Sequence, residues 1–171
     1  MKNKKQTRII KIIIFLLIAL IIALESSQFF RAVVPSSSML PTLQVQDQLI
    51  IKKIQYCKIQ RGDLIVFWKS GTLYIKRLIG LPGDIINIDN GQVFINGYPL
   101  KEEYVKYNDN YTGQFVVPDS SYFLLGDNRS NSADSRFWIN PYFDCETIVG
   151  KAVCFIYPKI AIIKEERYEV Y

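Results

Sequence analysis

The middle of the chain reads Ile85-Ile86-Asn87-Ile88-Asp89-Asn90-Gly91-Gln92-Val93-Phe94-Ile95, with apolar residues alternating on both sides of Asn90-Gly91. Alternation with a period of two is typical of a half-buried strand, and Asn-Gly favours the tight turn of a two-residue β-hairpin. We therefore expect two antiparallel strands over residues 85–95. This hairpin makes the expected fold class mainly β.

The same pattern continues outward from the hairpin in both directions. Further strands are predicted from β-branched and aromatic runs at Gln48–Lys53, Asp63–Trp68, Thr72–Ile79, Tyr122–Leu125 and Val149–Tyr157. Together they predict an antiparallel β-core. Residues 98–119 are rich in Tyr, Asn, Asp and Lys and show weak periodicity, so we expect a small inserted β-lobe there.

The N-terminal segment differs from the rest of the chain in its charge. The 171 residues include 21 Lys and Arg against 16 Asp and Glu. Five of these cations lie in the first eleven residues: Lys2, Lys4, Lys5, Arg8 and Lys11. No acid precedes Glu25, so the remaining chain carries no net charge. Nucleic-acid binding requires a basic face on the folded domain, and we expect no nucleic-acid partner.

An uncharged apolar run at residues 12–24 follows this basic start. With Ile9 and Ile10 it approaches the roughly 20 residues that span a bilayer. No small-x-small cleavage site follows Leu24, which argues against a removable signal peptide. We expect a cytoplasmic tail at 1–8, one transmembrane helix at 9–28 as anchor, and an extracytoplasmic catalytic β-domain at 29–171. This organisation predicts a single-pass protein of the cell membrane with a cytoplasmic N-terminus.

The residue types that are present limit the chemistry. The chain has no histidine, and its three cysteines show no metal-binding spacing. A zinc site is therefore not expected, and the sequence indicates no metal and no cofactor. The oligomeric state is left open. Because histidine is missing, a serine nucleophile requires a different base, such as a lysine.

A hydroxyl-rich turn, Pro35-Ser36-Ser37-Ser38-Met39-Leu40-Pro41-Thr42-Leu43, follows the predicted anchor. Ser38 is the candidate nucleophile because Pro41 restricts the backbone nearby and favours a constrained, non-helical turn. Serine-rich turns beside proline are common, so Ser38 alone does not identify a protease.

Lys76 lies in the strand-like stretch 72–79, among apolar and aromatic neighbours. Burial disfavours the charged form of a lysine and lowers its pKa, and each unit costs about 1.4 kcal/mol of stability. Such a cost is consistent with a neutral amine that is used as a general base. The alternative is an ordinary solvated lysine on an edge strand.

A polar loop, Gly126-Asp127-Asn128-Arg129-Ser130-Asn131-Ser132-Ala133-Asp134-Ser135-Arg136, follows the strand predicted at 122–125. Alternating Asp and Arg can form charge-assisted hydrogen bonds that make a loop rigid. In such a loop, Ser132 can hydrogen-bond a lysine amine and orient it. A simple polar surface loop is the alternative.

Four segments together resemble the bacterial type I signal peptidases in their short, single-anchor form. They occur in the order of that family and are Pro35–Leu43, Gly62–Phe67, Tyr74–Asp84 and Gly126–Arg136. Four such matches in sequence very rarely arise by chance. The fold of the family, an antiparallel β-core with a smaller second β-lobe, agrees with the strand prediction.

The resemblance implies a role for each matching residue. Ser38 takes the place of the nucleophile, and Lys76 takes that of the general base. Ser36 matches a side-chain donor to the oxyanion, and Ser132 matches the serine that positions the lysine. The structural acids and arginines of the last motif correspond to Asp127, Arg129, Asp134 and Arg136.

The resemblance also implies an activity. It predicts a membrane-bound serine endopeptidase that uses a Ser/Lys dyad to remove N-terminal signal peptides from secreted preproteins. Signal-peptide-bearing preproteins and the lipid bilayer are then its partners. Two alternatives stay open: a Ser/Lys peptidase restricted to one substrate such as a pilin, and a non-catalytic anchored β-domain. The joint presence of Ser38 and Lys76 argues against the second.

Overall fold

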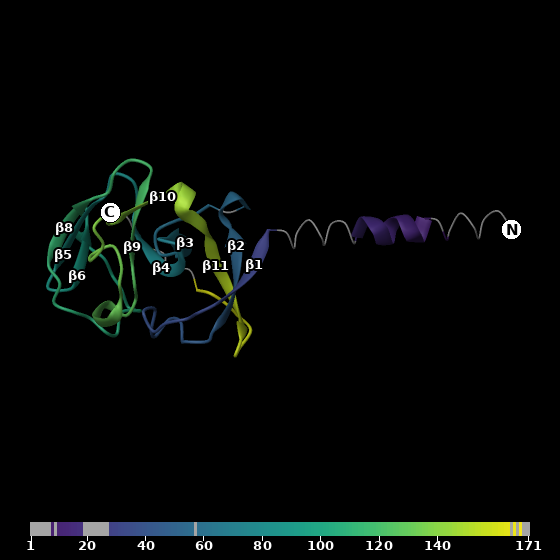
Figure 1. Ribbon diagram of the computed structural model, residues 1–171, viewed down its shortest axis with the longest axis horizontal. Helices are drawn as coiled ribbons and strands as arrows, with labels where there is room; N and C mark the ends of the chain where they lie inside the picture. Colours follow the sequence, from purple (N-terminus) through teal and green to yellow (C-terminus); the bar gives the residue numbers. More distant parts are fainter. Residues whose placement is uncertain are drawn as a thin grey trace.

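A computed structural model describes residues 8, 10–18, 28–56, 58–164, 166 and 168. Residues 10–18 are helical and lie apart from the β-sheets (Figure 1). Within the described ranges, no helix combines the length and the apolar character needed to cross a bilayer. Half of the predicted anchor at 9–28 and most of the predicted tail at 1–8 lie outside the described ranges.

The larger of two antiparallel sheets forms the body of the described domain. Its strand order is β1-β2-β11-β3-β4-β9-β10, and β12 pairs with β11. The strands are β1 (Phe29–Val33), β2 (Gln48–Lys53), β3 (Leu64–Lys69), β4 (Thr72–Gly80), β9 (Ser121–Leu125), β10 (Tyr142–Asp144), β11 (Ile148–Tyr157) and β12 (Ala161–Ile162). Short 3₁₀ helices lie in the connections: η1 (Ile54–Tyr56), η2 (Arg129–Asn131) and η3 (Cys145–Thr147).

The smaller sheet is built on the predicted hairpin. Its order is β7-β6-β5-β8, from β5 (Ile85–Asp89), β6 (Gln92–Ile95), β7 (Tyr98–Pro99) and β8 (Gly113–Val116). Asp89 pairs with Gln92 across the turn, which confirms a two-residue hairpin. Asn90 and Gly91 have φ angles of 48° and 82°, the positive values that this type of turn requires. Residues 98–119 add β7 and β8 on either side of the hairpin, at the end of the domain remote from β1 (Figure 1).

The other strand predictions are confirmed to within one residue at each end, and the fold is mainly β with two antiparallel sheets. Sequence reasoning did not find β1, although Phe29 pairs with Lys52 and Val33 with Gln48 over its whole length. Strand β1 has only five residues, so its alternation was too short to be recognised as a strand.

The core of the large sheet supports the loops that carry the candidate site. In β4, every residue from Lys76 to Gly80 is buried, because β3 and β9 pair with its two edges. Met39 and Leu43 are fully buried in the same apolar cluster as Leu49 of β2. Burying a side chain of this size contributes about 1.5–3 kcal/mol, so the turn at 36–43 is fastened to the sheet.

Candidate active site

Ser38 lies on a compact turn between β1 and β2. The N–H of Leu40 donates to the carbonyl of Ser37 at 3.1 Å, and the N–H of Leu43 donates to that of Met39 at 2.9 Å. These bonds and the buried Met39 and Leu43 side chains fix the backbone on both sides of the serine. Ser38 itself is 8% exposed, so it is almost completely buried.

The structure brings Lys76 to this hydroxyl from a strand 38 positions further along the chain. Antiparallel pairing places Lys76 opposite Ile65 of β3, in the buried half of β4. Its Nζ lies 2.6 Å from Oγ of Ser38, which is hydrogen-bond distance. Lys76 is 3% exposed, so the alternative of a solvated edge-strand lysine is wrong.

Burial changes the protonation of this lysine. Desolvation lowers the pKa of Lys76 from its ordinary value of 10.5 to about 8, although the charges of Asp134 and Asp127 act to raise it. At pH 7, a pKa near 8 leaves about one amine in ten neutral, against about one in three thousand at 10.5. A neutral amine has the lone pair that can accept the proton of Ser38.

The two other predicted serines lie close to the dyad but differ in their contacts. The hydroxyl of Ser36 is 3.3 Å from that of Ser38, so both face the same space. The buried hydroxyl of Ser132 makes no hydrogen bond, and the expected bond to Lys76 is not formed. A Cβ placed on Gly126 would meet Ser132 Oγ at 2.1 Å and the Ser38 carbonyl oxygen at 2.7 Å. Ser132 therefore lies beside the nucleophile turn, separated from it only by a glycine.

The acids and arginines of the 126–136 loop form a buried network, so the simple surface-loop alternative is wrong. Asp134 accepts from the backbone N–H of Gly126 at 3.0 Å and from Nε and Nη2 of Arg136 at 2.8 Å each. Arg136 also donates to the carbonyl of Arg129, and Arg129 donates to that of Gly126. These bonds tie the two ends of the loop together.

Asp127 connects this loop to both halves of the dyad. It is fully buried and accepts two hydrogen bonds from Arg77, the residue that follows Lys76 on β4. It also accepts from the hydroxyl of Thr42 on the nucleophile turn. One carboxylate therefore links the turn that carries Ser38 to the strand that carries Lys76.

Sequence reasoning missed several residues of this network. The backbone N–H of Asn128 donates to the Ser38 carbonyl, and its side chain donates to that of Ser37, both at 3.0 Å. Glu102 and Asp109, from the connection between β7 and β8, pair with two arginines of the loop at 126–136. Arg77 was missed as well. Its place in an apolar strand was a local indication, because a cation buried there requires a buried acid as its partner.

Comparison with known proteins gives consistent matches. A protein-family model described as "Signal peptidase, peptidase S26" matches residues 6–157. "Signal peptidase I" of Leptolyngbya laminosa is 44% identical over 138 residues, covering 73% of this chain and 67% of that protein. "Signal peptidase I P" of Bacillus subtilis subsp. natto is 38% identical over 174 residues, covering 92% of this chain and 94% of that protein.

Some relatives are longer than the segment that they share with this chain. "Probable signal peptidase I-2" of Synechocystis sp. is 42% identical over 136 residues, which is 73% of this chain and 62% of that protein. The chain thus spans somewhat less than two thirds of this relative and nearly all of the Bacillus one.

Proposed function

This chain belongs to the signal peptidase I family, peptidase S26, and we propose that Ser38 and Lys76 are its catalytic dyad. The family makes it a serine endopeptidase that cleaves signal peptides from preproteins. The observation that carries the assignment of the dyad is the 2.6 Å separation of Lys76 Nζ and Ser38 Oγ in a buried site. Among the described residues, Lys76 is the basic side chain that hydrogen-bonds Ser38 Oγ.

In the proposed mechanism, neutral Lys76 accepts the proton of Ser38 as Oγ attacks the scissile carbonyl carbon. The carbonyl π bond breaks and its electron pair forms an oxyanion. When the tetrahedral intermediate collapses, the C–N bond breaks and Lys76 gives its proton to the leaving amine. The neutral amine of Lys76 then deprotonates a water molecule, which attacks the carbonyl carbon of the acyl-enzyme. The ester C–O bond breaks, and Lys76 returns the proton to Ser38 Oγ.

Ser36 is proposed to stabilise the oxyanion together with the backbone N–H of Ser38. The Ser36 hydroxyl lies 3.3 Å from the attacking oxygen, so it reaches the carbonyl that Ser38 attacks. A donor in such a position contributes about 10²–10³ in rate, because the negative charge develops only in the transition state.

Ser132 is proposed to act on the lysine. A buried hydroxyl without a partner is unfavourable by about 1–3 kcal/mol, and such groups in native proteins call for an explanation. Its hydroxyl lies next to Gly126, which also adjoins the Ser38 carbonyl, so Ser132 is close to the backbone of the nucleophile. We assign it the positioning of Lys76, with Asp127, Arg129, Asp134 and Arg136 as the rigid support of that loop.

The substrate is proposed to bind in an apolar groove next to the dyad. A pocket of about 360 Å³ is lined by Phe30, Arg31, Ala32, Val33, Val34, Pro35, Leu49, Val66, Leu73, Tyr74 and Ile75. Two of these residues directly precede Ser36 and Lys76. Strand β4 pairs with β9 only from Arg77 onward, and β1 is the last strand on its side of the described sheet. Both edges can pair with an extended peptide.

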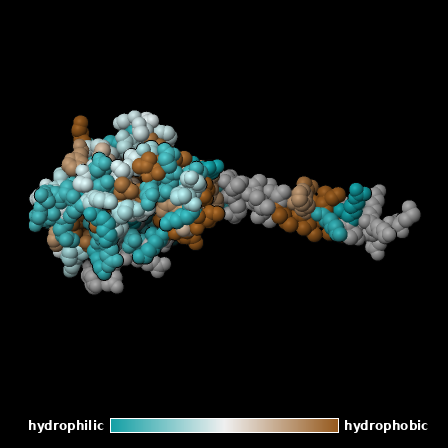
Figure 2. All heavy atoms as spheres, turned by 90° about the horizontal axis from the view of Figure 1, so that it is seen from below, coloured by the Kyte–Doolittle hydropathy of each residue, from teal (hydrophilic) through white to brown (hydrophobic). Residues whose placement is uncertain are grey.

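The membrane anchor predicted at 9–28 remains part of this proposal, with a cytoplasmic tail at 1–8 and an extracytoplasmic domain at 29–171. The described helical residues support it, because Figure 2 shows hydrophobic side chains over them and all the apolar ones are at least 50% exposed. Such a surface is suited to a lipid environment. Nine peptide bonds join Phe29 to Ser38, at most about 30 Å when extended, which keeps the dyad near the bilayer where a signal peptide presents its cleavage site.

The test is cleavage of a preprotein by the detergent-solubilised chain and by Ser38→Ala and Lys76→Ala variants. We expect cleavage after the small-residue site by the unsubstituted chain and none by either variant, with unfolding curves that show all three folded. Full activity of Lys76→Ala contradicts the proposed dyad. Cleavage of one dedicated precursor and of no general preprotein points to the substrate-restricted peptidase.

A further inference from the structure

The guanidinium of Arg77 is covered on one face by the ring of Tyr104, which lies in the connection between β7 and β8. Its guanidinium carbon lies 3.8 Å from the ring centroid of Tyr104. Arg77 and its partner Asp127 are almost completely buried, at 2% and 0% side-chain exposure. A guanidinium that stacks on a ring and makes two hydrogen bonds to a carboxylate is restrained in both position and orientation. Tyr104 therefore helps to decide where Arg77 and Asp127 lie beneath the dyad.

Tyr104 is held in place by Tyr168, which lies near the C-terminus. The Tyr168 hydroxyl donates to the Tyr104 oxygen at 2.8 Å, and the Tyr104 hydroxyl donates to Glu102 at 2.6 Å. Glu102 also accepts from Arg129 at 3.0 Å. Burial raises the pKa of both tyrosines above the ordinary value of 10, so both hydroxyls keep their protons and can donate.

Tyr168 also approaches the turn before β3. A Cβ on Gly62 would lie 2.9 Å from Cε2 of Tyr168 and 2.4 Å from the carbonyl oxygen of Glu166, so this contact leaves no room for a side chain. The carbonyl of Gly62 accepts from Nη1 of Arg77 at 2.8 Å. Two residues that Tyr168 contacts are therefore also in contact with Arg77: Tyr104 through its ring and Gly62 through its carbonyl.

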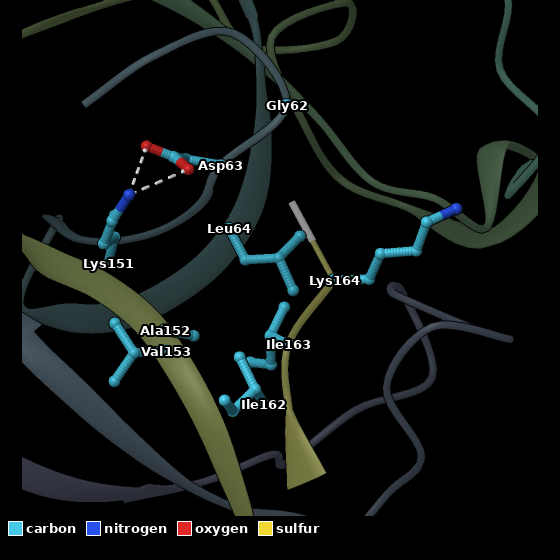
Figure 3. Close-up of a pocket in the computed structure, with 9 residues that line it drawn as sticks. All are labelled: Gly62, Asp63, Leu64, Lys151, Ala152, Val153, Ile162, Ile163 and Lys164. Atoms are coloured by element: carbon cyan, nitrogen blue, oxygen red, sulfur yellow. Dashed lines mark hydrogen bonds and ion pairs between the residues drawn. The ribbon is translucent and has the colours of Figure 1, made fainter. Parts of the chain in front are cut away.

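The described residues 162–164 line a pocket against the body of the domain. The N–H of Ile163 donates to the carbonyl of Val153 at 2.9 Å. Beyond it, a pocket of about 430 Å³ lies between the turn at Gly62 and residues 162–164. Figure 3 shows Leu64 and Ile163 facing each other across it, with the Lys151–Asp63 ion pair on one wall. Tyr168 also packs against the apolar cluster that contains Ile79, Ile86 and Phe123, so its position rests on this packing and on its contacts with Tyr104 and Gly62.

We propose that Tyr168 is a positioning residue for catalysis, by which the C-terminal segment holds Arg77 and Asp127 beneath the Ser38–Lys76 pair. This inference rests on the proposed function. The family match ends at residue 157, so Tyr168 lies beyond the segment that defines the family. A shift of Tyr168 would reach the dyad through Arg77 and Asp127. Arg77 adjoins Lys76 on β4, and Asp127 accepts a hydrogen bond from Thr42 of the nucleophile turn.

The experiment compares the full-length chain with Tyr168→Ala and Tyr168→Phe, using a signal-peptide substrate in detergent. Tyr98→Ala is the matched control, since Tyr98 is 55% exposed on the smaller sheet. We expect Tyr168→Ala to lower kcat about tenfold and to leave KM within about twofold, because small misplacements of a reacting group cost rate and not binding. Tyr168→Phe keeps the ring against Gly62 and should lose about threefold. The control should match the unsubstituted chain.

The dependence of kcat/KM on pH gives a second readout. If Tyr168→Ala shifts Arg77 and Asp127, the turn that Asp127 holds through Thr42 loosens, water gains access to Lys76, and the pH at which activity is half-maximal should move upward. Unchanged kcat, KM and pH profile in Tyr168→Ala, with at most a lower melting temperature, would overturn the proposal and leave only a structural role. An unsubstituted chain that cleaves no signal peptide would overturn the proposed function, and this inference with it.

Discussion

Lys76 and Arg77 are adjacent on β4 and are buried to almost the same extent, at 3% and 2% exposure, yet their surroundings are opposite. Lys76 meets the Ser38 hydroxyl, and desolvation lowers its pKa to about 8. Arg77 meets the carboxylate of Asp127, the carbonyl of Gly62 and the ring of Tyr104. Burial alone would lower the pKa of Arg77, but its bonds and its attraction to Asp127 raise the pKa above the ordinary value.

The comparison shows that burial gives a cation different roles according to its partner. A buried cation with a carboxylate stays charged and becomes part of the framework. A buried cation without a directly bonded carboxylate loses its proton more readily and becomes a base. Because neighbouring residues of a strand point to opposite faces, one dipeptide can supply both roles.

The largest expected effect on activity comes from replacing Lys76 by arginine, so that both positions carry a guanidinium. In Lys76→Arg, the base is replaced by a guanidinium that stays charged at any accessible pH. We expect preprotein cleavage to fall by about 10⁴-fold or more, as for the loss of other catalytic bases that act together with a serine. Single-turnover cleavage is the measurement, and an activity within tenfold of the unsubstituted chain would contradict the role of Lys76.

Substituting each cation by Met should change stability in opposite directions. Arg77→Met leaves the Asp127 carboxylate buried without its cation and should lower the unfolding free energy by about 3–5 kcal/mol. Lys76→Met removes a group whose shift from 10.5 to about 8 corresponds to about 3 kcal/mol, and it should raise stability at pH 7. Urea unfolding of both variants beside the unsubstituted chain tests this pair.

The gain from Lys76→Met should depend on pH. The pKa of Lys76 is lower in the folded than in the unfolded chain, so the penalty is complete below pH 8. It disappears as pH rises from about 8 to 10.5, because the unfolded chain then loses its proton as well. A gain that is the same at pH 7 and pH 10 would show that packing, and not protonation, is its source.

Substitution at the oxyanion position should have a smaller effect than loss of the base. Ser36→Ala is expected to lower kcat by about 10²–10³ and to change KM little, since the donor acts on charge that develops in the transition state. Ser37→Ala on the same turn is the comparison, because its hydroxyl accepts from Asn131 and does not face Ser38. Equal effects of the two variants would argue against a specific role for Ser36.

Ser132→Ala should have the smallest effect. It is expected to lower kcat about tenfold, through loss of the positioning of Lys76 that we propose for Ser132, while stability stays level or rises because a buried hydroxyl without a partner is removed. Kinetics and urea unfolding on the same preparation separate the two quantities. Reduced stability with unchanged kcat would contradict the assigned role.

The sequence was sufficient for those parts of the molecule that depend on local pattern. Asn90-Gly91 specifies its own turn, and the alternating runs specify strands to within one residue. The motif residues Ser38 and Lys76 were correctly expected to meet, because a serine nucleophile without histidine needs another base. The predicted bond from Ser132 to Lys76 was not found, since the rotamer of a small hydroxyl depends on its neighbours.

The contacts that the sequence could not predict are those between distant segments. Glu102 and Asp109 lie in a stretch without periodicity, and nothing in their neighbourhood indicates that they pair with buried arginines. Tyr168 lies in a polar C-terminal segment, where an exposed residue would be the ordinary expectation. Only the tertiary fold brings Glu102 and Asp109 to the buried arginines of the 126–136 loop, and Tyr168 to Tyr104, whose ring covers Arg77.

The most direct test of the account is the pKa of Lys76 itself in the folded, substrate-free protein. It can be measured by NMR titration of the chain labelled with ¹³C at lysine Cε, with the Lys76 signal identified by its absence in Lys76→Met. We expect the Lys76 signal to titrate near pH 8. If Lys76 instead titrates near the ordinary value of 10.5, burial does not prepare a neutral base, and the contrast between Lys76 and Arg77 has no catalytic meaning.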